Sequence, residues 1–303
     1  MEQAKQKLNL MPGVVAPLQR DKLLDRTLRW LIVMDALRVD YYTQYYTDGG
    51  SPDGDVETVR SMAGITYRWI NHFARLALRE QRKEILFFTA NPVCARELAN
   101  YKGHAGNPFR VVPLYEYLWG KHGTLQVPTV HPCDVNAAVQ SYIEAHGMPE
   151  FMVVWYIQPH APYIGKDAIP YMTWGMGMKD DLSVEVRKLD YLKKAARAGK
   201  ITDDQIKAAY AGNVDVVVPL ARKLALSLPG KGAITADHGE MLGEHGEYEH
   251  AAPPIYPQLL NVPWHRYVNP PCPVSKIPDH IGRELFDVGS DATRGKLRAL
   301  GYI

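Results

Sequence analysis

Short apolar segments alternate with longer amphipathic ones along most of the chain. Two segments, 66–80 and 202–228, place their apolar residues at the spacing of a helix that buries one face. Five other runs have the length and composition of strands buried on both faces, at 28–35 (LRWLIVMD), 84–90 (EILFFTA), 109–114 (FRVVPL), 151–158 (FMVVWYIQ) and 232–237 (GAITAD). Strands that alternate with helices predict a doubly wound α/β fold, with a mostly parallel central sheet and helices on both faces.

The boundaries between these segments carry further signals. Thr202 followed by Gln205 is the pattern of a capping box at a helix start, and Pro219 is expected to kink or split that helix. Between about 161 and 200 the periodicity weakens, which indicates a lid or substrate-binding loop, or else a surface excursion. We expect an N-terminal arm with a short helix at 1–27 and a single domain at 28–303.

Composition excludes several classes of protein. The chain has 303 residues, 46% of them hydrophobic and 22% charged, and its net charge of +2 is too small to predict binding to nucleic acid. No apolar run near the start is long enough to span a bilayer or to form a signal peptide, so we expect a cytoplasmic protein without a membrane span. The three cysteines, Cys94, Cys133 and Cys272, are too few and too scattered for a disulfide framework.

Three of the predicted strands end in residues that bind metals. Asp35 ends the run at 28–35, His160 lies just after the run at 151–158, and Asp237 ends the run at 232–237, with His238 directly after it. Ligands of open parallel sheets bind beyond the carboxyl ends of the strands, so these four side chains should face one crevice. Carboxylates combined with imidazoles suit Zn²⁺, Mn²⁺ or iron better than Ca²⁺, which prefers oxygen ligands.

Each of these residues also has a simpler explanation when it is taken alone. An aspartate after a strand, such as Asp35, is often a helix N-cap, and a single histidine such as His160 is often a packing residue. The Asp237-His238-Gly239 step is more specific, because an acid and an imidazole lie side by side at a strand exit. It opens the stretch 234–250 (ITADHGEMLGEHGEYEH), which holds three of the eleven histidines.

Three motifs, in chain order, resemble those of the alkaline phosphatase superfamily: IVMDALRVD, QPHAPY and ITADHGEMLGEHGEYEH. The most similar branches are the sulfatase-like hydrolases and the phosphoethanolamine transferases, and the C-terminal KLRALGYI resembles the end of many sulfatase-like chains. The resemblance implies an alkaline phosphatase-like fold, one or two divalent metal ions, and a hydroxyl or formylglycine nucleophile at a helix N-terminus. Zinc or manganese is expected, with calcium or magnesium as alternatives.

The resemblance assigns roles to individual residues. Thr66, in SMAGITYRWINHF, takes the position of the nucleophile; the alternatives are that it is only an N-cap, or that Ser61 or Thr58 is the nucleophile. The residues implied for the principal metal are Asp35, Thr66, Asp237 and His238. His160 and His250 would contact a second metal or the substrate phosphate, and with Thr66 they complete the implied catalytic set. Glu240 would orient His250 or His238.

The chain also departs from the family pattern. It lacks the C/S-x-P-x-R motif that is converted to formylglycine, which argues against sulfate-ester hydrolysis by the usual route. Tyr156 stands four residues before His160, where phosphatases with a second metal usually have an aspartate, so one tight metal with phosphate-binding histidines is an alternative. Phosphoethanolamine transferases have membrane helices before their catalytic domain, and none is found here, so an acceptor should be soluble or a partner should supply the membrane.

Together these observations predict a metal-dependent hydrolase or transferase that acts on phosphate monoesters or diesters through a threonine nucleophile. The alternatives are a sulfatase-like sulfuric ester hydrolase and a member of the fold that binds metal or phosphate without catalysis. A phosphoglycerate mutase-like isomerase is disfavoured, because the chain is too short for the inserted domain of that class. The sequence predicts neither the substrate nor the oligomeric state.

Overall fold

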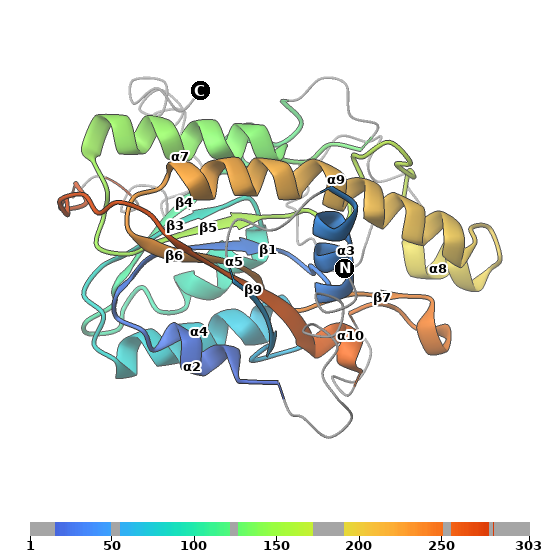
Figure 1. Cartoon of the computed structure of the whole chain (residues 1–303), viewed down its shortest axis with the longest axis horizontal. Helices are drawn as coiled ribbons and strands as arrows, with labels where there is room; N and C mark the ends of the chain where they lie inside the picture. The colour runs from blue at the N-terminus through green and yellow to red at the C-terminus, as the bar shows by residue number, and fades with distance from the viewer. Residues whose placement is uncertain are drawn as a thin grey trace.

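The computed structural model describes residues 16–49, 55–121, 127–171, 191–250, 256–278 and 281. Its centre is a seven-stranded sheet of order β2-β9-β6-β1-β5-β3-β4 (Figure 1). The strands are β1 (Leu28–Met34), β2 (Val56–Arg60), β3 (Ile85–Thr89), β4 (Phe109–Pro113), β5 (Met152–Tyr156), β6 (Lys231–Ala236) and β9 (Asn261–Val268). The block from β6 to β4 is parallel throughout, and its five strands are those predicted from the apolar runs. That prediction is confirmed.

Helices cover both faces of the sheet (Figure 1). On one face lie α7 (Pro132–His146) and α9 (Asp203–Ser227), and on the other lie α4 (Thr66–Arg79) and α5 (Pro92–Ala99). The rings of Trp69 and Phe73 on α4 pack against Trp155 of β5 and Phe87 of β3, at centroid distances of 5.3 and 5.7 Å. Because the central strands are covered on both sides, they are apolar throughout rather than alternating. The doubly wound α/β fold is confirmed.

Two strands of the central sheet, β2 and β9, are not predicted from the sequence. β9 runs antiparallel to β6, and β2 pairs antiparallel with β9 at the edge of the sheet. β2 has the sequence VETVR and only one of its five residues is buried, so it lacks the apolar run of the central strands. β9 contains Pro263, which cannot donate a ladder hydrogen bond and therefore argues against a strand when the sequence is considered alone.

Helix α9 bears on the predictions made for Thr202 and Pro219. Thr202 caps it, and the reciprocal bonds of the capping box with Gln205 are both present, as predicted. Of the two outcomes expected at Pro219, a kink or a split, the split does not occur, because the helix continues unbroken from Asp203 to Ser227. Pro219 and Asp215, whose carbonyl loses its helical partner, are both exposed, so water can satisfy that carbonyl.

The N-terminal region up to β1 packs on the sheet where it is described. The predicted short helix is α2 (Gln19–Leu23). Gln19 is fully buried, and its Nε2 donates to Thr235 Oγ1 at 2.9 Å and to the carbonyl of Ala236 at 2.7 Å. Its Oε1 accepts a hydrogen bond from Trp69 Nε1 at 2.7 Å. Gln19 therefore joins α2 to both the sheet and α4.

The region predicted as a lid is described only at its two ends. Residues 161–171 are irregular, and α8 (Leu192–Arg197) lies near the other end, a helix that the weak periodicity did not predict. The part at 172–190 and the C-terminal KLRALGYI (296–303) lie outside the described residues. Where the chain is described, its helices are too short or too polar to cross a bilayer.

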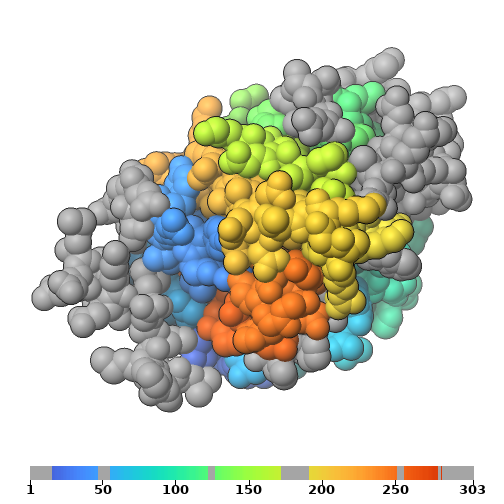
Figure 2. Space-filling model, turned by 90° about the vertical axis from the view of Figure 1, so that its right-hand side faces the viewer, coloured from blue at the N-terminus to red at the C-terminus, as the bar shows by residue number. Residues whose placement is uncertain are grey.

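Several small elements gather at the carboxyl ends of the parallel strands, on the face shown in Figure 2. They are α3 (Val39–Gly49), α8, and a hairpin of β7 (Met241–Leu242) and β8 (Tyr248–Glu249) with the 3₁₀ turn η2 (Glu244–Gly246) between them. The hairpin packs against α8 and the start of α9, where the Tyr248 hydroxyl donates to Asp203 Oδ1 at 2.8 Å. The two remaining short helices are α6 (Tyr115–Leu118) and α10 (Pro257–Leu260).

Candidate metal centre

Three neighbouring strands deliver the predicted ligands to one edge of the sheet. β1 lies between β6 and β5, and Met34 is in register with both Ala236 and Tyr156. Asp35 is the first residue after β1 and Asp237 the first after β6, so the two carboxylates leave the sheet at the same level. Sequence reasoning predicted this convergence, because parallel strands end at a common edge.

Asp35, Asp237 and His238 form the first group. Their ligand atoms all lie within 4.8 Å of one another, and all three residues are buried. His238 Nε2 is 3.1 Å from Asp237 Oδ2 and 3.9 Å from Asp35 Oδ1. His238 Nδ1 lies 2.7 Å from the carbonyl of Gly239, a contact that leaves Nε2 to face the carboxylates.

Thr66 reaches the same group from helix α4. Its hydroxyl donates to Asp237 Oδ2 at 2.8 Å and lies 3.2 Å from His238 Nε2. Thr66 is the first residue of α4, and the N-cap position belongs to Ile65. The alternative that Thr66 serves only as an N-cap is therefore wrong, since its hydroxyl bonds to the buried acid instead.

The surroundings of Asp35 exclude the other simple alternative. Its Oδ2 accepts hydrogen bonds from Asn91 Nδ2 and, at 3.2 Å, from Trp155 Nε1. Its carboxylate therefore does not cap α3, which begins four residues later at Val39. The backbone N–H of Ala36 donates to Asp237 Oδ1 at 3.0 Å, and this bond ties the two acidic segments together.

Two buried acids so close together produce opposing pKa shifts. Burial raises the pKa of the Asp35 carboxyl above its usual value, and the charge of Asp237 raises it further. Burial also acts to raise the pKa of Asp237, but His238 and hydrogen bonds from Ala36 and Thr66 hold it below its usual value. Burial acts to lower the pKa of His238, but the charge of Asp237 raises it to about 9. The acids therefore favour a positive charge among them.

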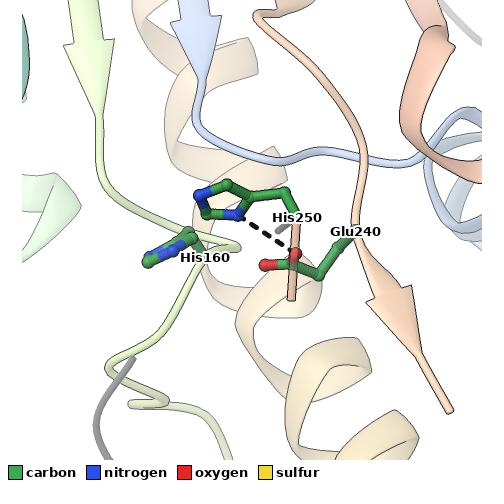
Figure 3. A group of neighbouring side chains, drawn as sticks. All are labelled: His160, Glu240 and His250. Atoms are coloured by element: carbon green, nitrogen blue, oxygen red, sulfur yellow. Dashed lines mark hydrogen bonds and ion pairs between the residues drawn. The ribbon is translucent and has the colours of Figure 1, made fainter. Parts of the chain in front are cut away.

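A second group consists of His160, Glu240 and His250, whose ligand atoms also lie within 4.8 Å of one another. His160 comes from the loop after β5, and Glu240 and His250 flank the β7–β8 hairpin (Figure 3). In Figure 3 both rings and the carboxylate extend from their backbones toward the same side. Glu240 Oε1 lies 3.2 Å from His250 Nδ1, so Glu240 orients His250 as predicted.

The two groups are adjacent. The ring centroids of His238 and His250 are 4.4 Å apart, and those of His160 and His250 are 5.2 Å apart. Burial lowers the pKa of His160 to about 4, which leaves its ring neutral and suited to bind a metal at neutral pH. Burial acts to raise the pKa of Glu240, but the neighbouring histidines hold it below its usual value.

Glu240 supplies the acid that is missing at position 156, where phosphatases with a second metal usually have an aspartate. Tyr156 is the last residue of β5, and its hydroxyl donates to Asn136 Oδ1 rather than to the candidate ligands. The carboxylate of the second group is that of Glu240, two residues after His238 in the chain. A second group with one acid and two imidazoles is thus present in the structure although Tyr156 stands where the acid was expected.

Unlike Thr66, the alternative nucleophiles Ser61 and Thr58 make no hydrogen bond to a candidate ligand side chain in the described part of the chain. The Ser61 hydroxyl donates to the carbonyls of Asp237 and, at 2.9 Å, of Ala63, so it supports the backbone of the strand exit. Thr58 lies within β2, paired with Pro263 of β9. His245, for which the sequence indicated no role, is exposed and stacks on Tyr256.

Arg38 also supports the site, and no role for it is predicted from the sequence. Its guanidinium is buried and bonds to Glu244 Oε1 at 2.6 Å, to both oxygens of Asp40, and to the carbonyl of Glu240 at 3.3 Å. It therefore joins the exit of β1 to the hairpin that carries the second group. The only signal in the sequence was a lone arginine three residues after Asp35, which does not by itself indicate a partner.

The chain shares its fold with solved phosphoethanolamine transferases. The soluble domain of lipooligosaccharide phosphoethanolamine transferase A from Neisseria meningitidis superposes with a TM-score of 0.51 at 14% identity, covering 85% of this chain and 80% of that domain. The integral membrane protein of the same name and organism gives a TM-score of 0.52 at 13% identity, covering 86% of this chain and 49% of that protein. No protein-family model and no curated protein matches the sequence. At such low identity the likeness shows the fold alone, and the fold implied by the motifs is confirmed.

Proposed function

We propose that this chain is a metal-dependent enzyme that hydrolyses or transfers phosphate esters, with Thr66 as its nucleophile. The observation that supports this most strongly is the place of the Thr66 hydroxyl. It lies at the first residue of α4, 2.8 Å from Asp237 Oδ2 and 3.2 Å from His238 Nε2. A threonine that served only as a cap would bond to the backbone of its own helix.

The chemistry of the donor set fits a divalent cation. Asp35 and Asp237 are two buried carboxylates that repel each other, and a cation between them would remove that cost. Asp35, Thr66, Asp237 and His238 would hold one ion, and His160, Glu240 and His250 would hold a second ion. In the absence of a second ion, His160 and His250 would contact the substrate phosphate. Mixed carboxylate and imidazole donors suit zinc or manganese. Such an ion supplies positive charge that favours ionisation of a nearby hydroxyl and stabilises phosphate oxygens.

The side chains of the chain itself would position the nucleophile. Asp237 accepts the hydrogen bond of Thr66 and thereby fixes the direction of its oxygen. In the reaction the Thr66 hydroxyl would give up its proton to Asp237 Oδ2, and its oxygen would form a bond to phosphorus while the bond from phosphorus to the leaving ester oxygen breaks. Backbone N–H groups in the first turn of α4 favour phosphate oxygens at this end of the helix.

If its histidines are not bound to a second ion, the second group would protonate the leaving oxygen. Glu240 accepts a hydrogen bond from His250 Nδ1, which keeps the imidazole oriented for delivery of a proton to that oxygen. His160 is neutral and would bind rather than donate. Water, or a second alcohol in a transfer reaction, afterwards attacks the phosphothreonine and restores the Thr66 hydroxyl.

The test is a substrate panel with divalent zinc or manganese added. Nitrophenyl phosphate, bis-nitrophenyl phosphate and nitrophenyl sulfate distinguish a phosphatase, a diesterase and a sulfatase. A phosphoethanolamine ester joins the panel because the solved protein of the same fold is named for that transfer. Comparison of water with an added alcohol as acceptor separates hydrolysis from transfer. We expect turnover of phosphate esters and little turnover of the sulfate.

Substitution of Thr66 tests the nucleophile itself. Thr66→Ala should lower kcat by roughly 10³-fold or more, as removal of a nucleophile does in other enzymes. Thr66→Ser keeps a hydroxyl on the same carbon and should retain much of the activity. Mass spectrometry of the acid-quenched wild type should find one phosphoryl group on Thr66. Normal turnover by Thr66→Ala would rule out this nucleophile, and a metal-loaded protein inactive on the whole panel would indicate a binding protein instead.

A further inference from the structure

The loop that carries His160 is held by a single buried amide from helix α9. Asn213 is fully buried, and its Nδ2 lies within hydrogen-bond distance of the carbonyls of Pro159, His160 and Pro162, at 3.1, 3.2 and 3.1 Å. Its Oδ1 accepts hydrogen bonds from the N–H groups of Ile164 at 2.6 Å and Gly165 at 3.3 Å. One side chain therefore contacts five main-chain groups of the segment 159–165.

These contacts use both N–H donors and both oxygen lone pairs of the Asn213 side-chain amide. Two N–H bonds serve three carbonyls, and both lone pairs of Oδ1 are occupied. Pro159 and Pro162 have no N–H, so this loop cannot pair its backbone in the manner of a strand. Buried carbonyls nevertheless need partners, and Asn213 provides them.

The backbone of the loop lies in close contact with the backbone of helix α9, which brings the loop within hydrogen-bond distance of the Asn213 side chain. A Cβ added to Gly165 would lie 2.2 Å from the carbonyl carbon of Gly212, the residue before Asn213. Glycine at 165 thus allows the loop to lie directly on the helix. His160 is held on its other side by its own N–H, which donates to the carbonyl of Asp35 at 3.2 Å.

We infer that Asn213 is a positioning residue, which fixes the backbone of His160 so that its ring meets Glu240 and His250. The inference builds on the proposed function for its effect on turnover, but its structural part stands on the contacts alone. Asn213 itself lies under the loop and acts only through it.

Amide hydrogen exchange tests the structural part without any assay of activity. Asn213→Ala should lose protection in the peptide that covers 159–165, with neighbouring peptides unchanged. The matched control is Asn269→Ala, in which an amide at the other end of α9 loses its bonds to the carbonyls of Ala225 and Leu228. The control should keep the protection of 159–165. Unchanged protection in Asn213→Ala, or an equal loss in both variants, would overturn the inference.

A double-mutant cycle tests the effect on turnover. Asn213→Ala should lower kcat by roughly 10²-fold, because misplacement of a group by about 1 Å can cost that much, while Asn269→Ala stays near the wild type. If Asn213 acts only through His160, the double variant Asn213→Ala/His160→Ala should be no slower than His160→Ala. Multiplied losses in the double variant would show a general defect and refute the positioning role.

A milder variant and an assay that is independent of turnover cover the cases in which Asn213→Ala does not fold or the wild type is inactive. Asn213→Ser retains one donor and one acceptor, so it should fall between the wild type and Asn213→Ala in both assays, and it serves alone if the alanine variant does not fold. An outcome in which Asn213→Ser loses no protection at 159–165 contradicts the inference. If the wild type is inactive on every ester, the proposed function fails, and the exchange experiment still decides the role of Asn213.

Discussion

Replacement of Arg38 by methionine should destabilise the protein more than the loss of any exposed ion pair. The guanidinium joins the exit of β1 to the β7–β8 hairpin, and the Arg38 side chain is only 7% exposed. Its partner Glu244 is 23% exposed, whereas Asp40 is 57% exposed. Methionine keeps most of the apolar stem and removes the charge, so the change isolates the polar contacts.

The size of the effect follows from how far each partner is exposed. The bond to Glu244 joins two charged groups near the interior and should contribute about 1.5–3 kcal/mol. The pair with Asp40 is screened by solvent and should contribute less than about 1 kcal/mol. With the bond to the carbonyl of Glu240, the total is about 3 kcal/mol, which corresponds to a fall in Tm of about 5 °C for a chain of this size.

Urea denaturation and thermal melting of the two proteins at neutral pH measure this difference. The matched control is Arg266→Met, which removes an ion pair with Asp55 whose two side chains are 49% and 75% exposed. The control should lose less than about 1 kcal/mol. If Arg38→Met is no less stable than Arg266→Met, the hairpin is held by other contacts and the reasoning from burial fails.

Three further predictions concern the packing of Gly232, the pair of Arg38 with Glu244, and the proposed metal centre. Gly232→Ala places a methyl group 2.0 Å from the ring of Trp30 and should destabilise the protein by about 3 kcal/mol or more, whereas Gly103→Ala, with nothing within 4 Å, should be near neutral in the same denaturation assay. Burial acts to raise the pKa of Glu244, but Arg38 holds it below the usual 4.5, so the stability from this pair is present above about pH 4.5 and is lost as the pH falls through the lower folded value. The difference between wild type and Arg38→Met should therefore shrink in acid melts, and a constant difference would contradict the assignment. Chelation of a bound metal should lower the free energy of unfolding by about 3–4 kcal/mol for an ion at 100 to 1,000 times its Kd, and an unchanged Tm would oppose the proposed metal centre.

Sequence reasoning succeeded where the signal is local. A strand covered on both faces needs several consecutive apolar residues, and this pattern identified all five parallel strands. Parallel strands end at a common edge, so Asp35, His160 and Asp237 could be expected to meet there. Thr66 came from the resemblance to a known family, because a threonine at a helix start is otherwise a common cap.

Other features depend on contacts between distant segments. Asn91 bonds to Asp35 across 56 positions, Asn213 bonds to Pro159 across 54, and Arg38 bonds to the carbonyl of Glu240 across 202. The hydrogen-bond partner of a polar residue at a strand end or in a helix is determined by the distant segment that packs against it in the folded chain. The edge strands β2 and β9 are similar, since β2 has little apolar signal and is identified as a strand by its pairing with β9.

The order of apolar and polar residues is thus sufficient to predict the layers of this protein and the edge at which its acids and histidines gather. That information is local, because burial of a strand or a helix face constrains neighbouring positions in a regular way. The partners of those acids and histidines come from the folded chain, since a buried polar group must be satisfied by whichever segment packs against it. Folding therefore determines that Thr66 bonds to Asp237, that Glu240 is the acid of the second group, and that Asn213 holds the loop of His160.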